Sequence, residues 1–224
     1  MKKVYISAGI LFLAAITGLD ALFLATGNIM FKAGASFMFS AESVLCVILC
    51  AKKKVPMKFP LLMMTAIILA FAADVVIECS FLLGALLFGI GHIFYFASYC
   101  RIEKFSPKDL IPSAISAVGL LIIIMTVPIL NFKSTLIHIA ICIYAVIISL
   151  MVGKSISDAI RSRNVLNIII MAGSVLFWIS DFALMFYIFG NIGFANYICL
   201  FTYYPAQFIL AMTPLIFANS RAKS

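Results

Sequence analysis

Charged side chains are scarce in this chain. Of its 224 residues, 11% are charged and 65% are hydrophobic, whereas about a quarter of a typical soluble domain is charged. No polar segment is long enough to form a separate soluble domain. The shortage of charge therefore excludes an ordinary soluble protein and predicts one transmembrane domain over residues 1–224.

Marks of several other protein classes are missing too. Lys2 and Lys3 precede an apolar run of about 20 residues, which is typical of a first membrane span rather than a cleavable signal peptide. The six cysteines lie within or at the ends of apolar runs without zinc-ligand spacing, so we expect free thiols packed as small hydrophobes. No HExxH-type motif is present, and we expect neither a metal nor another cofactor.

Apolar runs separated by short polar segments predict an all-α bundle of eight transmembrane helices. Each run is close to the roughly 20 residues that cross a hydrocarbon core. Gly-Asn pairs mark two of the turns, and the polar segments 101–109 and 153–164 are predicted to be loops. The predicted spans are residues 4–25, 30–51, 60–79, 81–100, 110–130, 134–152, 165–189 and 194–218.

Basic residues are distributed unevenly across these spans. All Lys and Arg except Lys32 and Lys133 fall on the side of the membrane that holds both termini. By the positive-inside rule this side is cytoplasmic. The net charge of +8 is then explained by topology, without a nucleic-acid partner. We expect a multi-pass protein of the cytoplasmic membrane if the source is bacterial, or of the endoplasmic reticulum if it is animal.

Two aspartates stand out inside the spans. An ionised side chain within a bilayer costs a few kcal/mol and commonly marks function. Asp74 and Asp181 have short side chains that cannot reach the interface, and a helical rise of about 1.5 Å per residue puts them roughly 21 and 24 Å from the cytoplasmic side. Glu78 follows Asp74 by four residues and shares its helix face. We expect the two aspartates to form a functional pair.

Other polar residues lie between the midplane and the outer face, so one shared site is geometrically possible. Each also has a structural interpretation: Lys32 reaching the interface, a neutral Glu42 bonded to another helix, Glu78 reaching water, or tyrosines in an interfacial belt. His138 is interpreted as interfacial. The candidates at this depth are Lys32, Glu42, Glu78, His92, Tyr203, Tyr204 and Gln207.

The order and spacing of these residues resemble the YhhN family, whose animal members include lysoplasmalogenases. The family has an Asp near the end of one span, then Phe-x-x-Gly, then His-x-x-Tyr. Its later Ser-Asp resembles Ser180-Asp181, and its late Tyr and Gln resemble Tyr203 or Tyr204 and Gln207. Ala73 and Ala33 depart from the family's Gly before the first Asp and its Pro after an early Lys. The residues that match the first motifs are Asp74, Phe81, Gly84, Phe88, His92 and Tyr95.

The resemblance implies an enzyme that hydrolyses the vinyl-ether bond of a lysoplasmalogen or a related lysolipid. This chemistry passes through an oxocarbenium ion and, as in glycosidases, needs a proton donor and a second group that activates water. Asp74 and Asp181 suit these roles, with their assignment left open. Substrate binding is predicted for Lys32, His92, Tyr95, Tyr203 and Gln207, and support for Glu42, Glu78, Tyr204 and Ser180.

Two other classes stay open. Proton-coupled transporters also use intramembrane carboxylates and histidines, although the sequence shows no clear repeat or pair of broken spans. A structural or sensing protein would instead bury the same residues in satisfied polar packing. Measuring aldehyde release and flux on one preparation separates these classes from the enzyme.

Overall fold

The fold is a bundle of long helices. The computed structural model describes residues 2–221, with side chains from residue 9 onward. Within this part, eight helices are long and apolar enough to cross a membrane, and there is no strand, which confirms the predicted all-α membrane fold. The helices are α1 (Lys2–Thr26), α2 (Ile29–Lys52), α3 (Lys58–Val76), α4 (Phe81–Ile102), the short 3₁₀ helix η1 (Pro107–Asp109), α5 (Leu110–Thr126), α6 (Thr135–Ser162), α7 (Val165–Gly190) and α8 (Gly193–Arg221).

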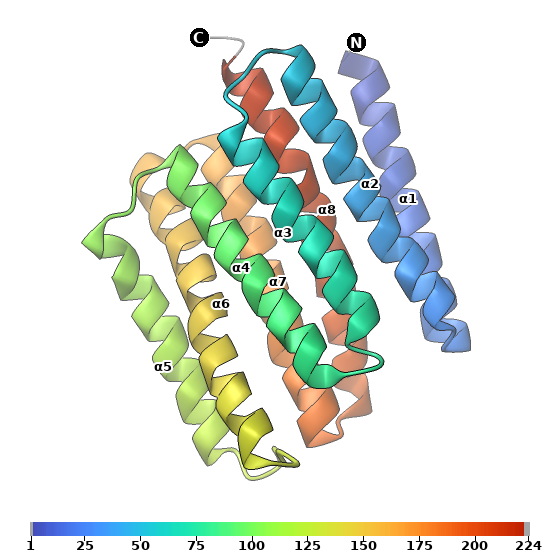
Figure 1. Cartoon of the computed structure of the whole chain (residues 1–224), viewed down its shortest axis with the longest axis vertical. Helices are drawn as coiled ribbons and strands as arrows, with labels where there is room; N and C mark the ends of the chain where they lie inside the picture. Colours follow the sequence, from blue (N-terminus) through green and yellow to red (C-terminus); the bar gives the residue numbers. More distant parts are fainter. Residues whose placement is uncertain (1, 222–224) are drawn as a thin grey trace.

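The helices run up and down in order, with α1 and α5 at opposite edges (Figure 1). Helix α2 packs against α1, α3 and α8, and α6 packs against α4, α5 and α7. Helices α7 and α8 pair closely, as do α3 and α4. Polar groups on α2, α3, α4, α6, α7 and α8 can therefore meet in the interior.

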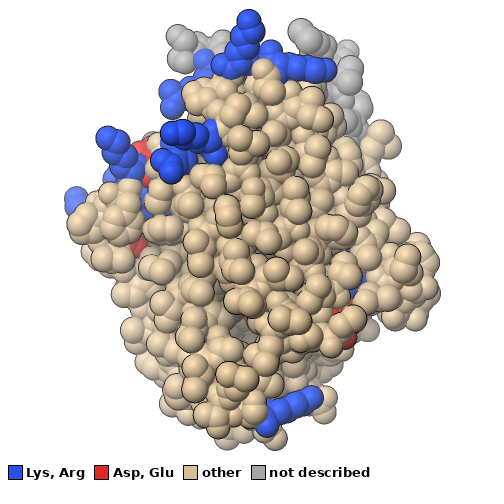
Figure 2. Space-filling view, viewed as in Figure 1, with Lys and Arg blue, Asp and Glu red and all other residues tan. Residues whose placement is uncertain are grey.

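Helix α1 begins and α8 ends at the same end of the bundle, called the terminus end below (Figure 1). Figure 2 shows most of the visible Lys and Arg side chains at this end. Lys223 and the side chains of Lys2 and Lys3 lie outside the described residues. The charge asymmetry predicts that the terminus end is cytoplasmic.

Two helices end earlier than predicted. Helix α5 stops at Thr126 instead of residue 130, because Pro128 disfavours helical backbone at Val127, whose φ and ψ are −82° and 109°. Helix α3 stops at Val76 instead of residue 79, and a short turn leads to the extended Ser80 before α4. This turn carries Glu78 away from the helix that holds Asp74.

The prediction of a loop over residues 153–164 is wrong, because α6 continues to Ser162. Lys154, Ser157 and Asp158 of this segment are buried and paired inside the protein. Lys154 is 0% exposed, with Nζ 3.2 Å from Asp109 Oδ2 and 2.6 Å from Asp158 Oδ1. Arg161 bonds the same two carboxylates at 3.2 and 2.6 Å. Two cations thus face two anions at the end of α6, where Lys154 and both carboxylates are buried and Arg161 stays partly exposed.

Close packing of α5 on α6 gives a first prediction. A Cβ built on Gly153 would lie 2.4 Å from Ser113 N and 2.5 Å from its Cα. Gly153→Ala is expected to destabilise the protein by about 1–3 kcal/mol, because backbone must shift. The melting temperature of the purified protein measures this. Gly119→Ala, on α5 with nothing within 4 Å of its Cβ, is the matched control and is expected to melt no earlier than the parent. Equal melting of the two variants would contradict the prediction.

Candidate active site

Asp74 lies in the last turn of α3 and is held by two residues of α2. Its Oδ1 is 3.2 Å from Lys32 Nζ, and its Oδ2 accepts a hydrogen bond from Ser36. Lys32 and Ser36 are four residues apart, so they lie on one face of α2. Asp74 and Lys32 are only 5% and 8% exposed. The first aspartate is therefore a buried group paired with a cation.

Lys32 also reaches the turn between α3 and α4. Its Nζ is 2.5 Å from Glu78 Oε1, and the Glu78 side chain is 40% exposed. Gly84 in α4 lets this turn pack closely, since a Cβ there would lie 2.6 Å from Ile77 Cα. One ammonium is thus shared by a buried and a partly exposed carboxylate. Lys32 is predicted to bind substrate, and its charge is engaged by these two acids.

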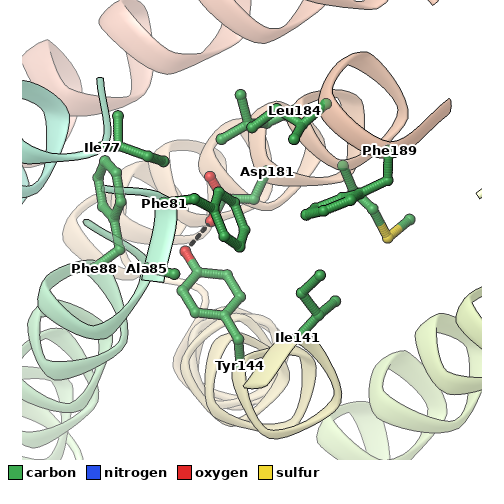
Figure 3. Close-up of a pocket in the computed structure, with 11 residues that line it drawn as sticks. Ile77, Phe81, Ala85, Phe88, Ile141, Tyr144, Asp181, Leu184 and Phe189 are labelled. Carbon is green, nitrogen blue, oxygen red and sulfur yellow. Dashed lines mark hydrogen bonds between the residues drawn. The ribbon is translucent and has the colours of Figure 1, made fainter. Parts of the chain in front are cut away.

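Asp181, in the middle of α7, has different partners. Tyr144 of α6 donates a hydrogen bond to its Oδ2 (Figure 3), and His92 Nε2 of α4 lies 3.3 Å from the same oxygen. His92 Nε2 is also 2.8 Å from Tyr144 Oη, and its Nδ1 is 3.3 Å from Met151 Sδ. No Lys or Arg within the described residues forms a salt bridge with Asp181. The second aspartate is therefore held by a phenol and an imidazole.

The two aspartates line one cavity, called the acidic cavity below. Its volume is about 210 Å³. Asp74 and Asp181 come from segments far apart in the sequence, and the packing of α3, α7 and α8 brings them to this space. Besides the two aspartates it is lined by Phe23, Lys32, Ile77, Glu78, Phe88, Ser180, Leu184, Tyr187, Ile188, Asn196, Cys199, Leu200 and Tyr203. Acids, a cation, an amide and hydroxyls thus meet beside apolar side chains in a largely enclosed space.

The remaining predicted site residues divide into two groups. Ser180 and Tyr203 line the acidic cavity; Tyr203 Oη donates to the Ala70 carbonyl at 3.4 Å. Tyr95 and Gln207 do not line it, but join each other by a 2.8 Å hydrogen bond in the fully buried core. The Tyr95 ring lies 6.3 Å from that of His92. Tyr95 and Gln207 therefore belong to the buried core beside His92 and do not line the acidic cavity.

Two predicted supporting residues lie outside the cavity. Tyr204 Oη donates to the backbone carbonyl of Lys32 at 3.5 Å, which fixes α8 against the start of α2. Glu42 is 2% exposed, and its Oε2 has no hydrogen-bond partner within residues 9–221. Glu42 is not among the residues that line the acidic cavity.

Several polar residues of the site were not predicted from the sequence. Tyr144 joins Asp181 to His92, Ser36 bonds Asp74, and Asn196 and Cys199 line the acidic cavity. Ser36 stands four residues after Lys32, a spacing that indicates a shared helix face. Tyr144 is an isolated tyrosine in the middle of an apolar span, and its depth within that span is the feature of the sequence that could have pointed to a role in the site. Within residues 9–221, no group of three or more His, Cys, Asp and Glu is arranged to hold a metal ion.

Comparisons with known proteins point to one family. No curated protein matches the chain, and no solved structure matches it. The model of the YhhN family matches residues 35–213, a region that includes both aspartates, His92 and Tyr144 and extends over most of the chain. The chain therefore belongs to the YhhN family.

Proposed function

We propose that this membrane protein is a hydrolase that cleaves the vinyl-ether bond of a lysoplasmalogen, or of a closely related lysolipid. The products are a fatty aldehyde and a glycerophospho-base. The observation that carries the proposal is that two buried aspartates with unlike partners line one cavity. Family membership is compatible with an enzyme.

Vinyl-ether hydrolysis requires an acid that delivers a proton to carbon. Asp181 suits this role because no Lys or Arg within the described residues pairs with it, and because apolar side chains line the cavity on one side of it (Figure 3). The hydrogen bonds described for Asp181 use Oδ2, so Oδ1 is left to carry the proton. Protonation of the β-carbon by Asp181 gives an oxocarbenium ion.

The second step requires a carboxylate. Asp74 suits this role because the Lys32 ammonium lies 3.2 Å from Oδ1 and stabilises negative charge. Asp74 takes a proton from water as the water adds to the oxocarbenium carbon, which gives a hemiacetal. Asp181 then accepts the hemiacetal hydroxyl proton, and Asp74 returns its proton to the departing glycerol oxygen. Both aspartates end in their starting forms.

The ion pair at the edge of the cavity suits a zwitterionic head group. Lys32 and Glu78 lie 2.5 Å apart, and Glu78 is the more exposed partner. In the complex, the phosphate would pair with Lys32 and the ammonium with Glu78. These two ion pairs would replace the one between Lys32 and Glu78, so that neither protein charge is left unpaired. Ser180 and Tyr203 line the same cavity and are proposed to bind the glycerol oxygens.

The proposal is tested by supplying purified protein with lysoplasmalogen and measuring aldehyde release. Substrate-dependent aldehyde formation supports a hydrolase. Proton-driven uptake into liposomes without aldehyde release would instead identify a transporter that uses the same carboxylates. Both assays are to be run on the same preparation.

Tyr144→Phe gives a prediction specific to the Asp181 cluster. The change removes the hydroxyl that donates to Asp181 and contacts His92, but keeps the ring. Turnover is expected to fall by about 10-fold, because a hydrogen bond to a group that carries or develops charge contributes roughly 1.5 kcal/mol. Tyr187→Phe also removes a phenol from the lining of the acidic cavity and is expected to keep near-normal turnover. Equal effects of the two changes would contradict the role given to Tyr144.

A further inference from the structure

A second cavity, called the apolar cavity below, meets the acidic cavity at Asp181. Apart from Asp181 and Tyr144, its lining side chains are apolar, and Phe81, Ile141 and Phe189 are among them (Figure 3). Its residues come from α4, α6, α7 and the turn after α3. The two cavities share Ile77, Phe88, Asp181, Leu184 and Ile188. Asp181 thus stands between a polar compartment and an apolar one.

The apolar cavity also adjoins a groove on the outer surface of the bundle, between α4 and α6. The groove has a volume of about 340 Å³ and is lined by apolar residues together with Tyr144. Three of its residues, Leu86, Ile93 and Ile143, are 59%, 53% and 57% exposed. In a bundle that spans a membrane, such a surface faces lipid chains.

The groove and the apolar cavity share two residues, Ala85 of α4 and Tyr144 of α6. We call this pair the neck. The side chain of Ala85 is a single methyl group, and Gly89, one turn on, also faces Tyr144, since a Cβ there would make an ordinary contact of 3.7 Å with Tyr144 Cδ2. The lining residues therefore run in series from the lipid-facing groove, through the neck, to Asp181.

We propose that a lipid with one unbranched hydrocarbon chain reaches Asp181 sideways from the bilayer, with its chain in the groove and the apolar cavity. The proposal concerns how the substrate of the proposed hydrolase enters, and so rests on that function. A hydrocarbon chain that moves from the bilayer into the groove stays in an apolar environment. The groove itself therefore adds little binding energy. Selection then occurs at the neck, where one chain passes Ala85, and at the acidic cavity, where Lys32 and Glu78 oppose a zwitterionic head group.

The apolar cavity is small, about 60 Å³. It accommodates only the carbons nearest the head group, and the rest of the chain extends along the groove into the membrane. The site therefore distinguishes straight chains from chains that branch near the head group, and does not measure total chain length. A lipid with two chains joined at the glycerol is excluded at the neck.

The test uses a photoreactive lysophosphatidylcholine with a saturated ester chain and a diazirine near its carbonyl. This probe has no vinyl ether, so labelling does not depend on the proposed hydrolysis. Ile141 and Met185 line the apolar cavity and are only 8% and 9% exposed, so bulk lipid does not reach them. In the intact protein in nanodiscs, mass spectrometry is expected to find adducts on these two residues. An excess of unlabelled lysophosphatidylcholine removes them, and excess two-chain phosphatidylcholine does not.

Ala85→Trp closes the neck and is expected to reduce these adducts by about 10-fold or more. Leu83→Trp is the matched control, because Leu83 is on the same helix, is 56% exposed and lines none of the cavities described above. It is expected to label as the parent does. Ala85→Leu, a smaller change, is expected to give an intermediate reduction and keeps the test decisive if the tryptophan variant does not fold.

Unchanged labelling in both Ala85 variants, or adducts confined to other helices, would overturn lateral entry. The result is separable from the proposed function. Adducts on Ile141 and Met185 without aldehyde release from a lysoplasmalogen would refute the hydrolase and keep the entry route. Aldehyde release that is insensitive to Ala85→Trp would refute the route and keep the hydrolase.

Discussion

Asp181→Asn is expected to reduce aldehyde release at saturating lysoplasmalogen by about 100-fold or more, the usual loss when a general acid is removed. Asparagine has nearly the same shape, and its carbonyl oxygen still accepts from Tyr144. It has no acidic proton to deliver to the β-carbon. The change therefore removes the first chemical step and leaves the cavity and its hydrogen bonds in place.

The matched control is another acid-to-amide change within the bundle. Glu103, which caps the end of α4, bonds Ser162 and Asn167 at the terminus end and is remote from both cavities. Glu103→Gln is expected to keep turnover near that of the parent. Melting temperatures of both variants show whether folding is affected. Normal turnover in a folded Asp181→Asn protein would refute the role of Asp181.

Asp74→Asn is expected to cause a loss of similar size, about 100-fold, because no carboxylate then takes the proton from the attacking water. It differs from Asp181→Asn in its effect on stability. Lys32 loses the partner 3.2 Å away and keeps Glu78 at 2.5 Å. A buried ammonium with one partner fewer costs stability, so the melting temperature is expected to fall.

A double substitution separates stability from catalysis at this position. In Lys32→Met with Asp74→Asn, the buried charge pair is replaced by two neutral side chains, which is often neutral or stabilising. The melting temperature is expected to recover, and turnover is expected to stay lost. Recovery of turnover together with stability would mean that Asp74 serves folding, not chemistry.

The acids of the site could be predicted because charge inside an apolar run is rare. Asp74, Asp181 and His92 are conspicuous within apolar spans, and depth along each predicted span placed them at a similar level. Helical depth does not give the direction in which a side chain points. That the two aspartates line one cavity depends on how α3, α7 and α8 pack, and no single span contains this information.

The partners of the acids were harder to predict than the acids. Tyr144 and Ser36 are uncharged and common in membrane helices, so nothing in their own spans distinguishes them. Lys32 was interpreted either as reaching the interface or as binding substrate, and its salt bridge with Asp74 brings together residues from α2 and α3. Such contacts between distant segments decide which polar residues belong to a site.

The error at residues 153–164 has a similar origin. A polar segment after an apolar run is typical of a loop, but Lys154 and Asp158 are buried against Asp109, far away in the sequence. Their charges cancel only once α5 and α6 are packed together. The early end of α5, by contrast, could have been predicted from Pro128, because proline disfavours helix at the residue before it.

The most direct test of the central claim is to run the reaction in deuterated and in heavy-oxygen water and to analyse the trapped products by mass spectrometry. Proton delivery to carbon followed by addition of water predicts deuterium on the carbon next to the aldehyde group. It also predicts heavy oxygen in the aldehyde and none in the glycerophospho-base. Heavy oxygen in the glycerophospho-base, or no aldehyde from folded protein, would contradict acid-catalysed vinyl-ether hydrolysis in the cavity shared by Asp74 and Asp181.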